Sequence, residues 1–72
     1  MITTLLEARK TAEENKINNT KQTFLFRHEG NWFNARWIDP HLGVFIVPNI
    51  TEKACFYSNQ FSLNTEAMVL ED

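Results

Sequence analysis

A hairpin between Gln22 and Ile38 is the feature that most constrains how this chain can fold. The segment reads QTFLFRHEGNWFNARWI, with aromatic and polar residues alternating on both sides of Gly30-Asn31. Gly followed by Asn is a two-residue signal for a type II′ turn between antiparallel strands. The pairs predicted by this turn are Glu29 with Trp32, His28 with Phe33, Phe26 with Ala35 and Phe24 with Trp37.

The predicted hairpin has two faces of different character. Successive side chains of a strand point to opposite faces, so a slip of one residue would exchange the two sets. The face expected to enter the core carries Phe24, Phe26, Phe33, Ala35 and Trp37. The face expected to tolerate solvent carries Leu25, Arg27, Glu29, Trp32, Asn34 and Arg36.

A helix is expected before the hairpin, over residues 5–16. Thr4-Leu5-Leu6-Glu7 has the pattern of a capping box, with Thr4 as the N-cap and Glu7 reaching back to free amides. The helix would present a narrow apolar stripe made of Leu5, Ala8 and Ala12. Ile17 is its last expected anchor, and Asn18-Asn19-Thr20 is expected to end it.

Further strands are expected after the hairpin. A turn at residues 39–43 leads into Val44–Val47, which Pro48 should terminate. All four residues of that strand are apolar, which predicts burial on both faces or one face exposed to a partner. Ala54–Tyr57 reads as a short strand, and Ser58-Asn59-Gln60 as a turn. Residues 67–70 are expected to form a final strand, with a helical turn as the alternative.

Together these elements predict an α+β fold in a single domain spanning residues 1–72. One N-terminal helix should pack on the aromatic face of an antiparallel meander sheet of four to five strands. A strongly curled, barrel-like sheet is the alternative arrangement.

Composition limits the classes of function. The 72 residues contain one cysteine, Cys55, which excludes an internal disulfide and a Cys-based zinc site. The longest apolar run, Leu42–Val47, is far shorter than the roughly 20 residues of a membrane span, and no signal peptide is recognisable. We therefore expect a cytoplasmic protein.

Charge is unevenly distributed along the chain: residues 1–37 carry a net charge of +2 and residues 38–72 a net charge of −4.

No catalytic, cofactor-binding or metal-binding constellation is predicted. His28 and His41 flank the strand that contains Trp32, and its length of about seven residues separates them by roughly 20–25 Å. Asp39 is expected in the turn after the hairpin, Glu29 is expected at the end of the first hairpin strand, and Cys55 within an apolar strand is expected to be a small core residue. The chain is therefore predicted to be non-enzymatic, with a Cys55/His site as a minor hypothesis that predicts a reactive thiol.

The partner-binding residues predicted from the sequence are Leu25, Arg27, Trp32, Arg36 and Ile38. Trp and Arg are the residues most enriched at binding hot spots, and an apolar patch on a polar face is typical of an interaction site. In the alternative interpretation, the final strand, the C-terminal segment or the helix covers this face, and Trp32 is ordinary core.

Two functions compete for this face. In length and in the absence of disulfides or metal ligands, the chain resembles the small one-domain proteins of phages and mobile elements. That resemblance implies an inhibitor or adaptor that binds a larger protein partner. The alternative protein partner of the same face is a second copy of the chain, in a homodimer. The second function is binding of single-stranded nucleic acid, in which Arg9, Lys10, Lys16 and Lys21 would assist the same face.

Overall fold

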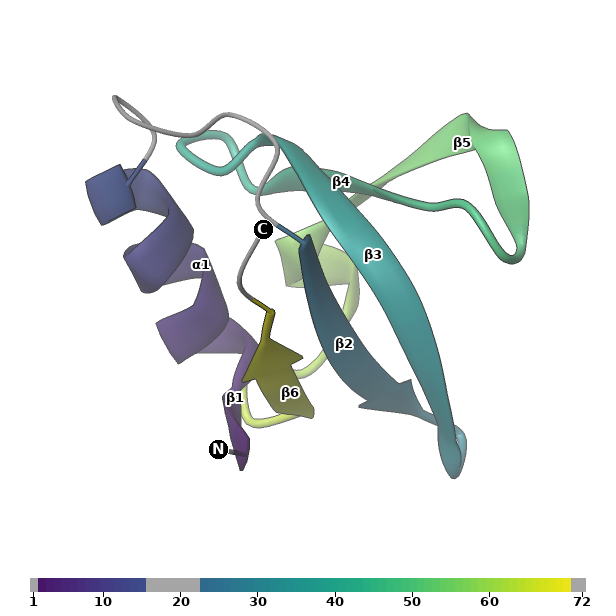
Figure 1. Ribbon diagram of the computed structural model, residues 1–72, viewed down its shortest axis with the longest axis horizontal. Coiled ribbons are helices and arrows are strands. Elements are labelled where there is room, and N and C mark those ends of the chain that lie inside the picture. The colour runs from purple at the N-terminus through teal and green to yellow at the C-terminus, as the bar shows by residue number, and fades with distance from the viewer. Residues whose placement is uncertain (1, 16–22, 71–72) are drawn as a thin grey trace.

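One helix and six strands form the fold of residues 2–15 and 23–70, which a computed structural model describes (Figure 1). The strands form one antiparallel sheet in the order β1-β6-β2-β3-β4-β5. The elements in chain order are β1 (Ile2–Thr4), α1 (Leu5–Asn15), β2 (Thr23–His28), β3 (Asn31–Asp39), β4 (Val44–Val47), β5 (Thr51–Tyr57), the 3-10 helix η1 (Ser58–Gln60) and β6 (Glu66–Val69).

This architecture confirms the predicted α+β fold with one helix packed on an antiparallel sheet. Strands β2 to β5 follow one another as the expected meander, but the sheet has six strands and is open, because β1 and β5 lie at opposite edges. Strand β1 was not predicted, and β6 returns to lie between β1 and β2. The barrel-like alternative is therefore wrong. In Figure 1, β1 and β6 lie beside α1, whereas the far end of the β4–β5 hairpin projects away from it.

The β2–β3 hairpin turns one residue earlier than its sequence predicted. Glu29 and Gly30 form the two-residue loop, and both have positive φ, 52° and 82°. This is the backbone of a type I′ turn, whose twist matches that of the flanking strands. The observed pairs are therefore His28 with Asn31, Phe26 with Phe33 and Phe24 with Ala35, so the predicted pairing is wrong by two residues. A shift of two leaves every side chain on its predicted face.

Helix α1 begins where the sequence predicts. The Glu7 N–H donates a hydrogen bond to Thr4 Oγ1 at 3.2 Å, as expected of an N-cap. The first two helical amides bond outside the helix, from Leu5 to the carbonyl of Thr65 and from Leu6 to that of Leu63. The predicted stripe is buried, since its three residues are all 1% exposed or less: Leu5, Ala8 and Ala12. Ile17 and residues 18–20 lie outside the described residues.

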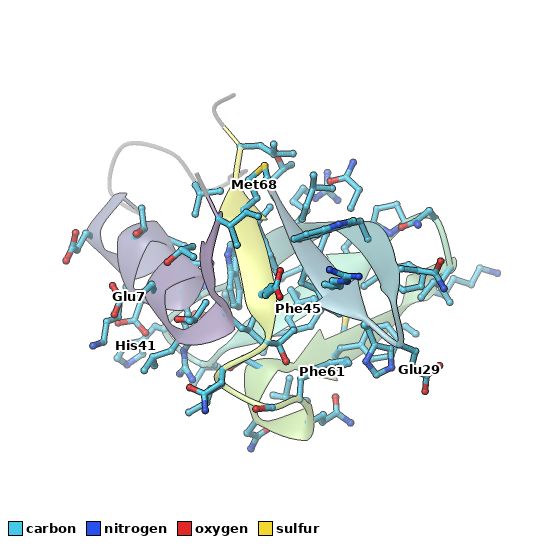
Figure 2. The ribbon with its side chains drawn as sticks, turned by 90° about the horizontal axis from the view of Figure 1, so that it is seen from below. Glu7, Glu29, His41, Phe45, Phe61 and Met68 are labelled. Atoms are coloured by element: carbon cyan, nitrogen blue, oxygen red, sulfur yellow. The ribbon has the colours of Figure 1, made fainter. Side chains whose placement is uncertain are left out.

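Phe45 is the centre of an aromatic core between α1 and the sheet (Figure 2). Its ring lies within 6.0 Å, centroid to centroid, of five others: Phe24, Phe26, Trp37, Phe56 and Phe61. All five pairs are edge-on or tilted, an arrangement that aromatic rings favour. Phe61 reaches the core from the bend after η1, so a residue outside the sheet completes the cluster.

The C-terminal half follows the predicted order with longer elements. Strand β4 has the predicted bounds, and three of its four residues are buried: Phe45, Ile46 and Val47. Strand β5 begins at Thr51, three residues earlier than expected. The turn at residues 58–60 is the 3-10 helix η1. Residues 66–69 form strand β6, so the helical alternative for this segment is wrong.

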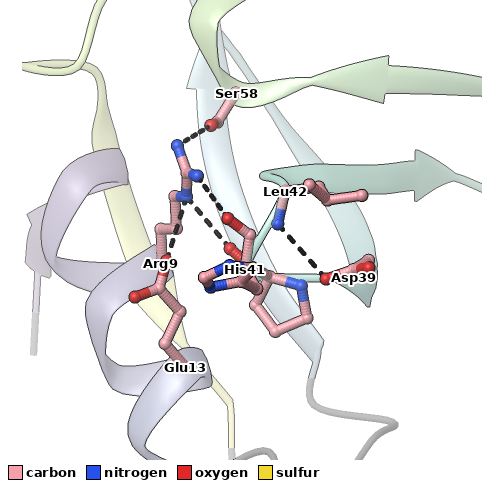
Figure 3. A network of polar contacts seen from close by, with 7 residues as sticks. Arg9, Glu13, Asp39, His41, Leu42 and Ser58 are labelled. Carbon is pink, nitrogen blue, oxygen red and sulfur yellow. Dashed lines mark hydrogen bonds and ion pairs between the residues drawn. The ribbon is translucent and has the colours of Figure 1, made fainter.

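Arg9 ties α1 to the β3–β4 turn and to η1 (Figure 3). Its guanidinium donates hydrogen bonds to the carbonyls of Pro40 (3.0 Å) and His41 (2.8 Å) and to Ser58 Oγ (3.1 Å). It also forms an ion pair with Glu13, at 3.3 Å. The turn itself is held by the Leu42 N–H, which bonds to Asp39 Oδ1 at 3.2 Å. Arg9 thus fixes the position of the helix at one end of the sheet.

Candidate partner-binding face

The side of the sheet opposite α1 forms a second face, which we call the outer face. Residues directly opposite each other on neighbouring strands share a face, so the register assigns its members. Its residues are Ile2 and Thr4 from β1, Glu66 and Met68 from β6, Thr23, Leu25 and Arg27 from β2, Trp32, Asn34 and Arg36 from β3, Val44 and Ile46 from β4, and Cys55 and Tyr57 from β5. Helix α1 packs on the other face, through the buried stripe. The outer face therefore carries no layer formed by α1.

Trp32 lies directly opposite Arg27 in the hairpin, in place of the predicted pairing of Trp32 with Glu29. Its side chain is 38% exposed. Arg27 Nη1 lies 3.9 Å from Glu66 Oε2 on the neighbouring strand β6. Neither α1 nor β6 covers Trp32, because α1 is on the other face and β6 pairs beside β2. The alternative in which the helix or the final strand makes Trp32 ordinary core is therefore wrong; the end of the C-terminal segment, residues 71–72, lies outside the described residues.

Leu25 continues the outer face toward the β1 edge. It pairs with Asn34 on one side and with Met68 on the other, and both Leu25 and Met68 are half-buried. Met68 in turn pairs with Ile2, which is exposed. The sequence predicted Leu25 on this face but gave no sign of Met68 or Ile2 beside it. Their addition makes an apolar row that crosses three strands.

Arg36 lines a hollow on the outer face. The hollow has a volume of about 470 Å³ and is lined by Thr23, Asn34, Ala35, Arg36, Ile46 and Pro48. Arg36 is exposed and pairs with Thr23 on β2 and with Ile46 on β4. Ile46 is only 7% exposed although it lies on the solvent side of the sheet. The side chain of Ala35 is buried in the core, so this residue meets the hollow through its backbone.

Ile38 lies at the end of β3, where the pairing with β4 shifts between Trp37 and Asp39. Its side chain is 49% exposed, as is that of Tyr57, which pairs with Val44 across β4 and β5. Ile38 continues the alternation of Trp32, Asn34 and Arg36 along the strand. All five predicted partner-binding residues are therefore on the outer face or at its end, and four of them are exposed: Arg27, Trp32, Arg36 and Ile38.

The sequence indicated only part of this face. Alternation within β2 and β3 identified the hairpin residues. The run of β4 is apolar throughout and does not alternate, so only the register shows that Val44 and Ile46 point outward. The β6 residues could not be assigned because their pairing with β2 joins segments about 40 positions apart. No local periodicity reports such a contact.

The residues considered for catalysis are dispersed. His28 packs against the rings of Phe26, Phe33 and Phe61, and its Nε2 lies 3.7 Å from Glu29 Oε1. His41 is exposed in the β3–β4 turn, at the opposite end of β3, and its carbonyl accepts a hydrogen bond from Arg9. Figure 2 shows His41 beside α1 and Glu29 at the far side of the molecule.

Cys55 differs from its prediction. It is exposed on the outer face of β5, opposite Ile46, and is not the core residue expected from the apolar character of that strand. The reason is the register of β5, which turns Phe56 toward the core in its place. Among residues 2–15 and 23–70, no group of three or more His, Cys, Asp and Glu side chains is placed to hold a metal ion.

The basic residues of the helix do not join the outer face. Arg9 donates to the β3–β4 turn and to Ser58, and Lys10 Nζ lies 3.7 Å from Glu7 Oε1. Both belong to α1, which lies on the opposite side of the sheet from Trp32. Lys16 and Lys21 lie outside the described residues. The structure therefore does not bring Arg9 and Lys10 together with the Trp/Arg surface that the nucleic-acid hypothesis requires.

In the part of the chain that is described, no helix is both long enough and apolar enough to cross a lipid bilayer. The chain matches no protein-family model, and comparison with curated proteins and with solved structures finds no match.

Proposed function

We propose that this chain is a non-enzymatic protein-interaction module that inhibits or adapts a larger protein by binding it through the outer face. The observation that carries the proposal is the one-sided packing of the sheet. Helix α1 covers one face, while the other presents Trp32 and Ile38 to solvent next to two arginines, Arg27 and Arg36. Tyr57 adds a second exposed aromatic side chain at the β5 edge.

The composition of this face supports a protein as the partner. Trp, Tyr and Arg are the residues that most often dominate binding energy, because each combines a large contact area with a directional polar group. The apolar residues are spread over several strands, which suits a broad contact more than a deep cleft for a small ligand. The arginines can orient the partner through charge as well as contact area.

The test compares three forms of the protein as bait in a lysate of the organism from which the chain comes. These are the wild type, Trp32→Ala and Leu42→Ala. Leu42 is the matched control, because it is a large exposed side chain in the β3–β4 turn, away from the outer face. The proposal expects a partner that is retained by the wild type and by Leu42→Ala and lost by Trp32→Ala.

A dilution series followed by light scattering or sedimentation must accompany this comparison. If the wild type is a dimer that Trp32→Ala converts into a folded monomer, the outer face serves self-association. If a partner binds Trp32→Ala as well as the wild type, binding uses another surface, and the proposal is wrong.

A further inference from the structure

The two arginines of the outer face differ in their surroundings. Arg27 has a carboxylate on the neighbouring strand, that of Glu66 at 3.9 Å. Arg36 has no ion-pair partner among the side chains that the structure describes. It is also the arginine that lines the hollow, together with Thr23, Asn34, Ile46 and Pro48. One cation of this face is thus partly neutralised, and the other is placed beside a concave site.

The lining of the hollow separates into two chemical parts. Arg36, Asn34 and Thr23 offer a guanidinium, an amide and a hydroxyl, all of which can donate hydrogen bonds to a carboxylate. Ile46 and Pro48 offer apolar surface on the β4 side. A volume of about 470 Å³ is within the range of sites that bind small ligands or single side-chain groups.

We infer that this hollow is the anchoring site for an acidic and apolar segment of the protein partner. An Asp or Glu carboxylate of that segment would bind Arg36, while an apolar side chain would enter the hollow against Ile46 and Pro48. The inference rests on the proposed function and adds the chemistry of the partner to it. Charge complementarity carries the assignment, because the guanidinium is the one charged group of the lining.

Spacing suggests the form of a minimal probe. Arg36 and Ile46 are direct cross-strand neighbours, with Cβ atoms about 5 Å apart. In an extended peptide, residues two apart point to the same side and are separated by roughly 6.6 Å. The probe is therefore the capped tripeptide acetyl-Leu-Ala-Glu-amide. Its neutral counterpart is acetyl-Leu-Ala-Gln-amide, and N-acetyl-leucine represents a C-terminal carboxylate.

The experiment is an NMR titration that follows the backbone amides of Asn34, Arg36 and Ile46, with those of Gly30 and Leu42 as remote references. The expected result is a saturable chemical-shift change of the hollow amides with the Glu peptide, with a dissociation constant in the millimolar range. Binding of the Gln peptide and of N-acetyl-leucine should be at least fivefold weaker. Arg36→Gln should abolish the shift, and Arg36→Lys should weaken it, because a lysine cannot bind a carboxylate in the bidentate manner of arginine. Arg27→Gln is the matched control and should leave the titration unchanged.

Several outcomes would overturn the inference. These are no shift of the hollow amides, equal binding of the Glu and Gln peptides, tighter binding of N-acetyl-leucine, or equal loss in Arg27→Gln and Arg36→Gln. Because the titration needs no natural partner, its failure leaves the bait comparison of Trp32→Ala intact. Conversely, the hollow could bind the Glu peptide while a partner binds Trp32→Ala as well as the wild type. The proposed use of Trp32 would then be wrong, while the anchoring chemistry of the hollow would stand.

Discussion

Trp32 and Trp37 lie on the same strand, five positions apart, and point to opposite faces of the sheet. Trp37 is 2% exposed and stacks on Phe24, with ring centroids 4.7 Å apart. Trp32 is 38% exposed and lies beside Arg27. An odd separation along a strand requires this difference, because side chains alternate between faces. The strand therefore provides a core residue and a candidate binding residue of the same type.

This pair makes a matched test of the two faces. Trp37→Ala should lower the free energy of unfolding by about 3–5 kcal/mol, because it removes a buried ring and leaves a cavity. Trp32→Ala should lower it by about 1 kcal/mol or less, as is usual for partly exposed positions. Urea denaturation of the two variants measures both values. Comparable losses in the two variants would show that Trp32 is a core residue and would remove the basis of the proposed function.

The type I′ turn makes a prediction for Glu29. A non-glycine residue with φ of 52° is strained, and Asn tolerates this conformation better than Glu. Glu29→Asn should therefore raise the free energy of unfolding by about 0.5–1 kcal/mol. Thermal or denaturant unfolding measures the change, with Glu29→Gln as the control that removes the carboxylate near His28 and keeps the strain. If Gly30-Asn31 were the loop instead, Asn at position 29 would bring no gain.

Gly43 and Gly30 both have positive φ, but only Gly43 is also enclosed. A Cβ at Gly43 would lie 2.5 Å from Ser58 Oγ and 2.9 Å from Arg9 Cζ. Around a Cβ at Gly30, by contrast, no described heavy atom lies within 4 Å apart from those of Gly30 and its two chain neighbours. Gly30→Ala should cost about 1–2 kcal/mol of stability through strain alone. Gly43→Ala should cost roughly 2–4 kcal/mol, since steric displacement adds to the strain. Equal losses in chemical denaturation would mean that the Arg9–Ser58 contact can move aside without cost.

Arg9 should matter for stability through geometry as well as charge. Arg9→Gln removes hydrogen bonds to Pro40, His41 and Ser58 and should lower the free energy of unfolding by about 1–3 kcal/mol. Arg9→Lys should recover little of it, because an ammonium group cannot reach three acceptors arranged for a guanidinium. Lys10→Gln is the control on the same helix and should change stability by less than about 0.5 kcal/mol. Full rescue by lysine would show that only the charge near Glu13 matters.

The exposure of Cys55 predicts a thiol that reacts without unfolding. Its modification by a disulfide reagent such as Ellman's reagent should proceed in the native protein at a rate near that of the denatured chain. The comparison of the two rates is the measurement. A native rate lower by a hundredfold would place Cys55 in the core and contradict the register of β4 and β5. Because exposure alone explains reactivity, a reactive thiol no longer supports a Cys55/His enzyme site.

The sequence by itself determined which residues of the hairpin share a face, but not how they pair. Alternation has a period of two, so Phe24, Phe26 and Trp37 fall on the core face in the predicted and in the observed register alike. The choice between the two registers depended on the turn, where Glu29 adopts positive φ although its side chain does not favour it. Local signals likewise determined the start of α1 at its Thr4 cap and the bounds of β4.

The tertiary structure alone decided the extent of the sheet and the identity of the outer face. The insertion of β6 between β1 and β2, the contacts of Arg9 with Pro40 and Ser58, and the exposure of Cys55 all depend on segments distant in the chain. Such contacts form because burial of the aromatic core brings the segments together. The periodicity of residues within one segment does not show which other segments lie next to it. The candidate site was therefore predictable along β2 and β3, whose paired residues are close in the sequence. It was not predictable across β4 and β6, whose neighbours depend on how the core packs.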